Sequence, residues 1–226
     1  MIDRLTEHGA GSLHVLSDIP VQVPERALLR AMRIPRLQTL DDLPEADLRE
    51  QLRDAVVRGL SLAEPRATVR WLALPWAAGD TGDGVLAPPR VAGHIFQGAS
   101  VRRWFAGCRR VTLMVVTIGA ALDHAVRALE HDAIGRAFHL DTVGSVLVES
   151  AVDAVDADIS KAIRKAGFEP TRRRSAGYGD WSLDAQPAIL RWCDARRIEV
   201  GATEAHVLRP SKSVTAAIGW RDEEGP

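Results

Sequence analysis

Cysteine is scarce in this sequence, and its scarcity limits the compartment and the chemistry that can be expected. The 226 residues contain two cysteines, Cys108 and Cys193, which stand too far apart for a metal-ligand motif. Two isolated cysteines in a chain of this size are typical of reduced thiols in the cytosol. We therefore expect a cytoplasmic protein whose cysteines are buried structural thiols and not nucleophiles.

Other common signals are missing as well. No apolar run approaches the about 18 residues that a membrane span needs, and the charged N-terminus has no signal-peptide core. The formal net charge is -1, so no overall field draws the chain to nucleic acid or to a membrane. The histidines show no zinc-binding spacing, and no phosphate-binding glycine motif opens a helix. We therefore expect no membrane, nucleic-acid, metal or P-loop site.

The composition is that of an ordinary globular protein, with 46% hydrophobic and 26% charged residues. The glycine- and proline-rich stretch 75–90 is the best internal boundary. We expect a helical and strand part over 1–90 that is integrated with the core, a core domain over 91–220, and a disordered tail over 221–226.

Periodicity and turn residues locate the expected elements. The continuous apolar, β-branched run from Arg110 to Ile118 predicts a strand buried on both faces. Ser100 is expected to cap a short helix that begins there. Helices are predicted over 24–34, 44–60, 100–105 and 120–129, from near Asp132, and over 141–166 and 183–195. Strands are predicted over 12–16, 68–74, 95–96, 110–118, 197–200 and 214–219.

Three arginines, Arg172 to Arg174, run straight into a turn in which Gly177 and Gly179 flank Tyr178, the only tyrosine of the chain. The glycines allow positive φ, so the backbone can approach a ligand closely. A guanidinium presented in this way is suited to hold a carboxylate through two parallel hydrogen bonds. The alternative is a solvated basic loop with a tyrosine that only packs the turn.

An acidic stripe lies upstream on the helix predicted over 141–166. Glu149, Asp153 and Asp156 follow one another at i, i+4 and i+7, so they share one face. A sulfonium or ammonium group needs a nearby carboxylate, because an unpaired cation is costly to bury. The alternative is an acidic face that is simply exposed to solvent.

A second turn, Arg209-Pro210-Ser211-Lys212-Ser213, is rich in hydrogen-bond donors. It is suited either to bind an anion, such as a cofactor phosphate, or to brace the neighbouring elements as a hydrogen-bonded turn.

Together these motifs resemble a known family. Arg173-x-x-x-Gly177-Tyr178, followed by Gly179-Asp180-Trp181, Gln186 and Pro210-x-x-Ser213-Val214, is similar to the C-terminal activation domain of cobalamin-dependent methionine synthase, and more closely to the small stand-alone proteins that contain only that domain. The resemblance spans roughly residues 90 to 219. It continues upstream in Phe96-x-Gly98-x-Ser100, Gly107-Cys108, Val111-x-Leu113, Thr117-x-Gly119 and the helix 141–165.

The resemblance implies an α+β fold with a twisted, mostly antiparallel sheet flanked by helices. It implies a subunit that binds S-adenosylmethionine and supports reductive methylation of the cobalamin of a separate methionine synthase, in methionine biosynthesis. The electron would come from a flavodoxin-like donor. One alternative is a non-catalytic docking module for another corrinoid methyltransferase. Another is an autonomous methyltransferase acting on a small acceptor, although no acceptor-side base is visible.

The resemblance also implies the ligand-binding residues, and none of them acts as a catalytic acid or base. Arg173 would contact the ligand, and Asp153, with Glu149 next, would supply the helix carboxylate. Glu169 lies near a family glutamate but is shifted by two residues. Full-length family members continue past the second turn and contribute a further tyrosine, so that contact is expected to be absent or replaced here. The motif residues expected at the adenine or at the ligand are Ser175, Ala176, Gly177 and Tyr178.

Overall fold

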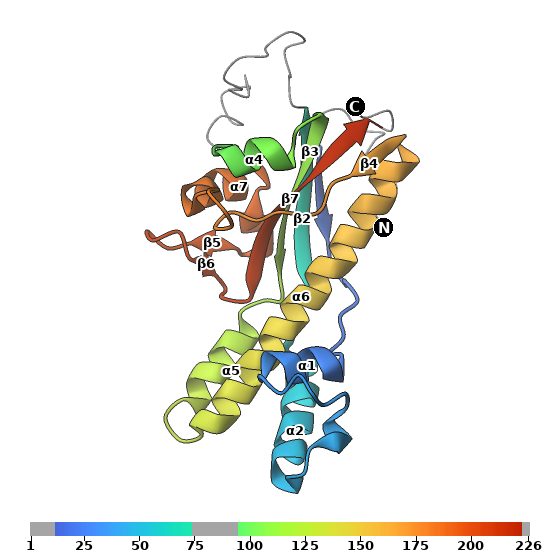
Figure 1. Ribbon diagram of the computed structural model, residues 1–226. Helices are drawn as coiled ribbons and strands as arrows, with labels where there is room; N and C mark the ends of the chain where they lie inside the picture. The colour runs from blue at the N-terminus through green and yellow to red at the C-terminus, as the bar shows by residue number, and fades with distance from the viewer. Residues whose placement is uncertain (1–11, 74–94, 223–226) are drawn as a thin grey trace.

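A computed structural model describes residues 12–73 and 95–222. Its centre is a five-stranded sheet in which every neighbouring pair of strands is antiparallel (Figure 1). The order across the sheet is β1-β2-β3-β7-β4. The expected α+β class with a mostly antiparallel sheet is therefore confirmed. The strands are β1 (Leu13–Leu16), β2 (Arg66–Ala73), β3 (Cys108–Thr117), β4 (Phe168–Pro170) and β7 (Ser213–Asp222).

The central strand β3 carries side chains into two hydrophobic cores, one on each face of the sheet. Met114 and Val116 belong to the core on one face, and Leu113 and Val115 to the core on the other. All four side chains are completely buried, because successive side chains of a strand point to opposite faces. The predicted burial of this strand on both faces is confirmed.

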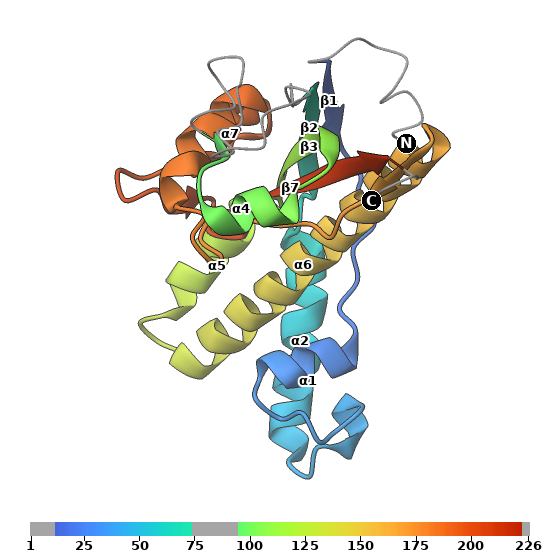
Figure 2. The same ribbon diagram turned by 45° about the horizontal axis from the view of Figure 1, so that its top comes forward.

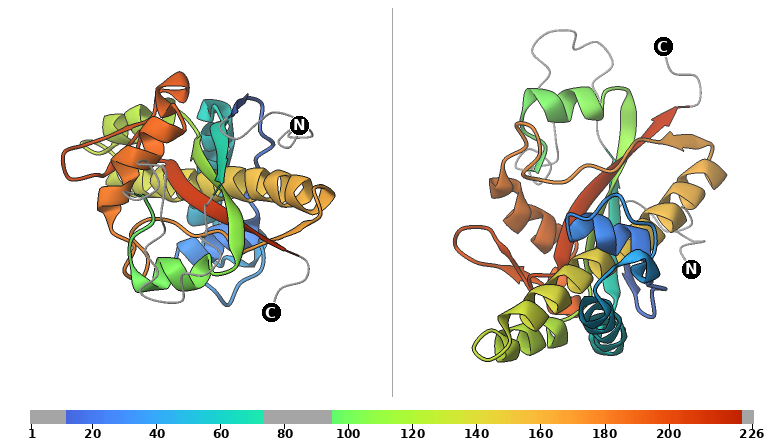
Figure 3. Two further views of the ribbon diagram at one scale, coloured as in Figure 1. Left: turned by 90° about the horizontal axis from the view of Figure 1, so that it is seen from above. Right: turned by 60° about the horizontal axis from the view of Figure 1, so that its bottom comes forward.

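One face of the sheet is covered by α6 (Ile134–Lys165), which crosses the molecule from the α5 side to the β4 side (Figure 3). Beyond one end of the sheet, three further helices gather around α6 (Figure 1). Small residues allow this close packing, since a Cβ on Gly59 would stand only 2.5 Å from Val143. The three helices are α1 (Glu25–Ala31), α2 (Ala46–Leu62) and α5 (Ala121–Leu129), and a 3-10 turn, η1 (Leu40–Asp42), precedes α2.

The helix predicted to begin near Asp132 and the helix predicted over 141–166 form one continuous helix, α6, which begins at Ile134. Its first turns bury only a narrow apolar stripe, because Ala137 and Leu140 are buried while Ile134 is 73% exposed and Phe138 is 55% exposed. The hydrophobic periodicity that marks an amphipathic helix is therefore weak there.

The opposite face of the sheet carries shorter elements (Figure 2). They enclose the second core, in which Trp181 is buried against Phe96 and Phe105. These elements are α4 (Ala99–Trp104), η2 (Leu183–Ala185), α7 (Gln186–Trp192), η3 (Ala195–Ile198) and the hairpin of β5 (Gly201–Ala202) and β6 (Leu208–Arg209).

Several local predictions were wrong. Residues 197–200 do not form a strand, because η3 ends at Ile198 and Glu199 has a left-handed φ of 59°. Ile95 and Phe96 belong to none of the strands, and both are buried in the second core. The predicted helix 183–195 is split between η2 and α7.

The ends of two predicted segments also need correction. The strand β7 continues to Asp222, so Arg221 and Asp222 belong to the sheet and not to a tail. The predicted loop 75–90 and the rest of the tail lie outside the described residues. Within the described ranges, no helix is long and apolar enough to cross a membrane.

Candidate ligand-binding site

The chain after β4 continues along β7 and reaches the Gly-Tyr-Gly turn. The Thr171 N–H donates to the Gly219 carbonyl at 2.9 Å, and Arg174 exchanges two backbone hydrogen bonds with Ala217, at 2.9 and 2.7 Å. The four residues 171–174 of this edge segment therefore lie opposite only three residues of β7, 217–219. The extra residue is a β-bulge, which redirects side chains next to it.

The bulge decides which arginine points to which face of the sheet, because it places Thr171 and Arg174 on the same face although they are three residues apart. Arg174 turns toward α4, where its guanidinium lies 4.8 Å from the ring centroid of Trp104. Thr171 turns to the same face, beside the position of Gly219. Arg173 turns the other way and reaches α6. One arginine of the triplet is therefore selected for the α6 face, and Arg172 is exposed.

Arg173 meets the whole predicted acidic stripe. Its Nη1 donates to Asp153 Oδ1 at 2.5 Å and its Nη2 to Glu149 Oε2 at 3.0 Å. Asp156 Oδ2 lies 3.5 Å from Nη1. Partial burial of the guanidinium opposes its charged form, but the hydrogen bond to Asp153 and the charges of all three carboxylates raise the pKa of Arg173.

The cluster carries a surplus of negative charge, because three carboxylates face one guanidinium. The side chains of Glu149 and Asp153 are 60% and 69% exposed, while that of Arg173 is 27% exposed. The carboxylates are therefore accessible to a cation from solvent. Such a cluster is suited to a ligand that carries both a carboxylate and a positive charge.

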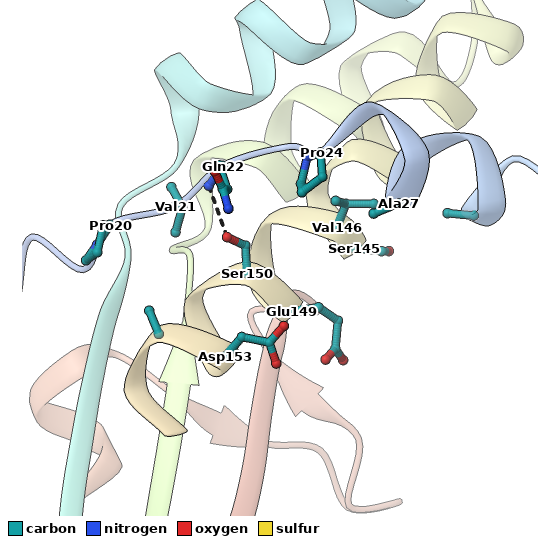
Figure 4. Close-up of a pocket in the computed structure, with 12 residues that line it drawn as sticks. Pro20, Val21, Gln22, Pro24, Ala27, Ser145, Val146, Glu149, Ser150 and Asp153 are labelled. Atoms are coloured by element: carbon teal, nitrogen blue, oxygen red, sulfur yellow. Dashed lines mark hydrogen bonds between the residues drawn. The ribbon is translucent and has the colours of Figure 1, made fainter. Parts of the chain in front are cut away.

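A groove of ≈ 670 Å³ adjoins the cluster between α6 and the segment that leads into α1 (Figure 4). The Gln22 N–H donates to Ser150 Oγ at 3.0 Å and holds the segment against the helix. Glu149 and Asp153 belong to the groove as well as to the Arg173 cluster. This contribution from residues 20–31 was not predicted from the sequence. The only sequence signal for it is the pair Ala27 and Ala31, one turn apart on α1.

The Gly-Tyr-Gly turn is anchored by the second core. The Gly177 N–H donates to the Trp181 carbonyl at 2.7 Å, and Gly177 has a φ of 94°. The Trp181 Nε1–H donates to the Ile95 carbonyl at 2.7 Å. Ala176 is buried, whereas Tyr178 is 69% exposed. The turn therefore presents the tyrosine ring to solvent on a fixed backbone, and Ser175 leads into it half-buried.

Glu169 is not part of the cluster. It lies on β4, its side chain is 54% exposed, and its charged neighbour is Arg164, at 4.0 Å. Of the sequence-predicted side chains, the structure brings together Arg173, Glu149 and Asp153.

The turn around Pro210 braces the helices. The backbone N–H and the hydroxyl of Ser211 both donate to the carboxylate of Asp123 on α5, each at 2.7 Å. Lys212 Nζ lies 2.7 Å from Asp141 on α6, and its side chain is only 10% exposed. These donors are directed at protein carboxylates, so the bracing interpretation is favoured over anion binding.

The cap of α4 comes from the turn and not from Ser100. The Asp180 carboxylate accepts hydrogen bonds from the backbone N–H groups of Ala99 at 2.7 Å and Ser100 at 2.9 Å. The residue at the N-cap position is Gly98, which has no side chain to act as a cap. The Gly-Tyr-Gly-Asp turn is thereby joined to α4.

These features place the chain among α+β proteins built on one antiparallel sheet with helices on both faces. No protein-family model matches the sequence, and no curated protein matches it. Among solved structures, the chain is similar to a crystal structure of the MetH reactivation domain bound to AdoHcy, with a TM-score of 0.62 and 12% sequence identity. The match covers 96% of this chain and 81% of that one. At this identity the likeness establishes the fold.

Proposed function

We propose that this chain binds S-adenosylmethionine at the Arg173 cluster and acts as the reactivation subunit of a separate cobalamin-dependent methionine synthase. The observation that carries the proposal is the contact of Arg173 with Asp153 and Glu149. It joins the first residue of the R-x-x-x-G-Y motif to a helix carboxylate pair. The pair occurs in a fold similar to that of a reactivation domain crystallised with AdoHcy.

The charges of the ligand suit the cluster. S-adenosylmethionine carries an α-carboxylate, an α-ammonium and a sulfonium. Its carboxylate would pair with Arg173, and its cationic groups would take the place of the guanidinium beside Glu149 and Asp153. Arg173, Glu149 and Asp153 would thus each exchange a protein partner for a ligand partner.

The turn would complete the site. The backbone of Ser175, Ala176 and Gly177 would contact the adenine, as the resemblance implies. Tyr178 is exposed on a fixed turn and is available to stack on the ligand or on the partner. Glu169 lies apart from the cluster, and the proposal does not depend on it.

The chain's contribution to the reaction would be positioning. It would hold the sulfonium methyl group toward the reduced cobalt of the partner's cobalamin, and a flavodoxin-like donor would supply the electron. The cobalt would be the nucleophile, so no general acid or base is needed from this chain. Holding two reactants close together in a reactive orientation can remove roughly 7–11 kcal/mol of entropic cost from a barrier.

An alternative function is a non-catalytic docking module for another corrinoid methyltransferase. The observation that favours it is the saturation of Arg173 by three carboxylates of its own chain. A cluster that satisfies itself can serve to join the edge segment to α6 without any ligand.

Calorimetric titration with S-adenosylmethionine tests the proposal on the wild type, on Arg173→Ala and on Arg172→Ala. Arg172 is the matched control, because it is the exposed neighbour in the same triplet and lies outside the cluster. We expect binding by the wild type and by Arg172→Ala, and loss of at least about tenfold in affinity for Arg173→Ala, since an Arg–carboxylate pair contributes more than 1 kcal/mol.

A wild type that does not bind millimolar ligand would overturn the independent site and leave the docking alternative. Equal losses in the two arginine variants would show that only general charge matters. A wild type that binds but does not promote methylation of a partner's cobalamin would support ligand binding and contradict the reactivation role.

A further inference from the structure

The groove beside α6 has the size and shape of a small-molecule site. Its volume is ≈ 670 Å³, within the roughly 300–1,000 Å³ of typical ligand pockets. It is bounded by Pro20, Val21, Gln22, Pro24, Ala27 and Ala31 on the N-terminal side. On α6 it is bounded by Ser145, Val146, Glu149, Ser150, Asp153 and Ala154.

The space exists because small side chains face each other across it. Ala27 and Ala31 lie one turn apart on α1, and Ser150 and Ala154 lie one turn apart on α6. The large apolar residues of α1, Leu28 and Leu29, are fully buried in the core and leave the groove unfilled.

Hydrogen bonds within the protein hold the N-terminal wall in place. The Gln22 N–H donates to Ser150 Oγ, as Figure 4 shows. The carboxylate of Glu25 accepts a hydrogen bond from the Leu40 N–H at 2.8 Å, which fixes the first turn of α1. These hydrogen bonds restrict the motion of the wall, which lowers the entropy lost on binding.

The chemistry of the groove points to an apolar group next to a positive charge. Prolines, valines and alanines supply most of the wall, and two carboxylates, Glu149 and Asp153, lie on the α6 side. An anion would be repelled by this pair, and a neutral apolar ligand would gain nothing from it. A sulfonium has no N–H to donate and carries its charge among carbon substituents, so it needs carboxylates and apolar contacts at the same place.

We infer that the groove receives the methylene carbons bonded to the ligand's sulfonium centre, with its methyl group left exposed to the partner, and that residues 20–31 are thus part of the ligand site. This inference rests on the proposed function and adds a wall to the site that lies outside the R-x-x-x-G-Y motif. Arg173 does not line the groove, so the ligand spans from the guanidinium, past Glu149 and Asp153, into the groove.

Three variants with the same substitution test the inference. Ala27→Leu and Ala154→Leu fill the groove from its two walls, whereas Ala157→Leu adds the same side chain to an exposed position of α6 outside it. The measurements are calorimetric titration with S-adenosylmethionine and the midpoint of urea unfolding. On the wild type, they include nuclear Overhauser contacts between the ligand's methylene groups next to sulfur and the Ala27 and Ala154 methyl groups.

We expect both groove variants to lose about tenfold or more in affinity, because the space for the ligand is filled. Ala157→Leu should bind like the wild type, and the wild-type complex should show the contacts with the alanine methyl groups. Normal binding by folded Ala27→Leu and Ala154→Leu, with no such contacts in the wild type, would overturn the inference and leave the proposed function intact. No binding by the wild type would overturn both. Groove variants that bind the ligand but fail to engage the corrinoid protein would reassign the groove to docking and overturn the inference.

Discussion

Arg173 Nη1 donates to Asp153 Oδ1 at 2.5 Å, joining a β-bulge at the sheet edge to the middle of the longest helix. Between the two residues, the chain completes α6 and passes through β4. The contact brings the two ends of this segment together. This ion pair connects the two parts of the candidate site. Its effects on stability and on binding can be separated by mutation.

The Arg173 cluster should make a modest contribution to stability. Arg173→Ala leaves three carboxylates facing one another, and we expect a loss of about 1 kcal/mol or less, because Glu149 and Asp153 are mostly exposed and screened. Asp153→Asn added to Arg173→Ala should recover part of the loss by removing repulsion. Urea unfolding of the two single variants and the double variant measures the coupling. A loss that does not shrink in high salt would contradict an electrostatic origin.

Asp180 should make the stability of the chain depend on acid pH. Partial desolvation opposes its charge, but hydrogen bonds from the Ser100 and Ala99 N–H groups lower the pKa of Asp180 below the ordinary value of 3.8. A lowered folded-state pKa means stability that is present above pH 3.8 and lost as the pH falls through the folded value. Asp180→Asn should be less stable than the wild type at pH 6, and the gap should close in acid. A gap that is constant with pH would contradict this role.

Gly98 should be irreplaceable at the cap of α4. Its φ is 113°, and an added Cβ would lie 2.7 Å from Asp180 Oδ1. Gly98→Ala should therefore lose roughly 1–3 kcal/mol through backbone strain and through displacement of the capping carboxylate. The matched control is Gly135→Ala on α6, where an added Cβ meets nothing within 4 Å. That variant should gain up to about 1 kcal/mol, since alanine favours a helix. Thermal unfolding of both variants checks the opposite signs.

Lys212 should be a structural lysine. Lys212→Met keeps the apolar stem but removes the partner of Asp141, and we expect a loss of about 1–2 kcal/mol because Asp141 is half exposed and can be resolvated. Replacing chloride by phosphate at equal ionic strength should change the melting temperature of the wild type and of Lys212→Met by the same amount. A phosphate-dependent stabilisation seen only in the wild type would restore the anion-binding interpretation.

Both cysteines should be unreactive in the folded chain. Burial raises the pKa of Cys108 to about 11 and that of Cys193 to about 12, above the ordinary thiol value of 9.0, so little thiolate exists at neutral pH. A disulfide reagent at pH 8 should label neither cysteine in buffer and both in concentrated urea. Rapid labelling of the native chain would contradict their burial.

Elements whose signal is local were predictable. The strand β3 was predicted from its continuous run of apolar, β-branched residues. Periodicity and turn residues placed β1, β2, α2 and α5 near their observed bounds. The acidic stripe of α6 was placed on one face because i, i+4 and i+7 spacing depends only on the helix itself.

Features that depend on distant partners were not predictable. Serine is a residue type that often caps helices, and Ser100 was therefore expected to cap α4. The capping group is instead the carboxylate of Asp180, 80 residues later in the chain. The groove wall of Ala27 and Ala31 has no motif, because it is defined by the helix that lies opposite.

The sequence by itself determined the elements that have a local signal, because periodicity and spacing act over a few residues. Through the resemblance of its motifs, it also indicated the class of the fold and a short set of charged residues around one turn. The tertiary structure decided which arginine of the triplet meets the acidic helix. That choice depends on a bulge against Ala217 and Gly219, and hence on the pairing of a sheet edge with the last strand of the chain. A single extra residue in such a pairing changes the face to which a side chain points, and only the folded sheet defines it.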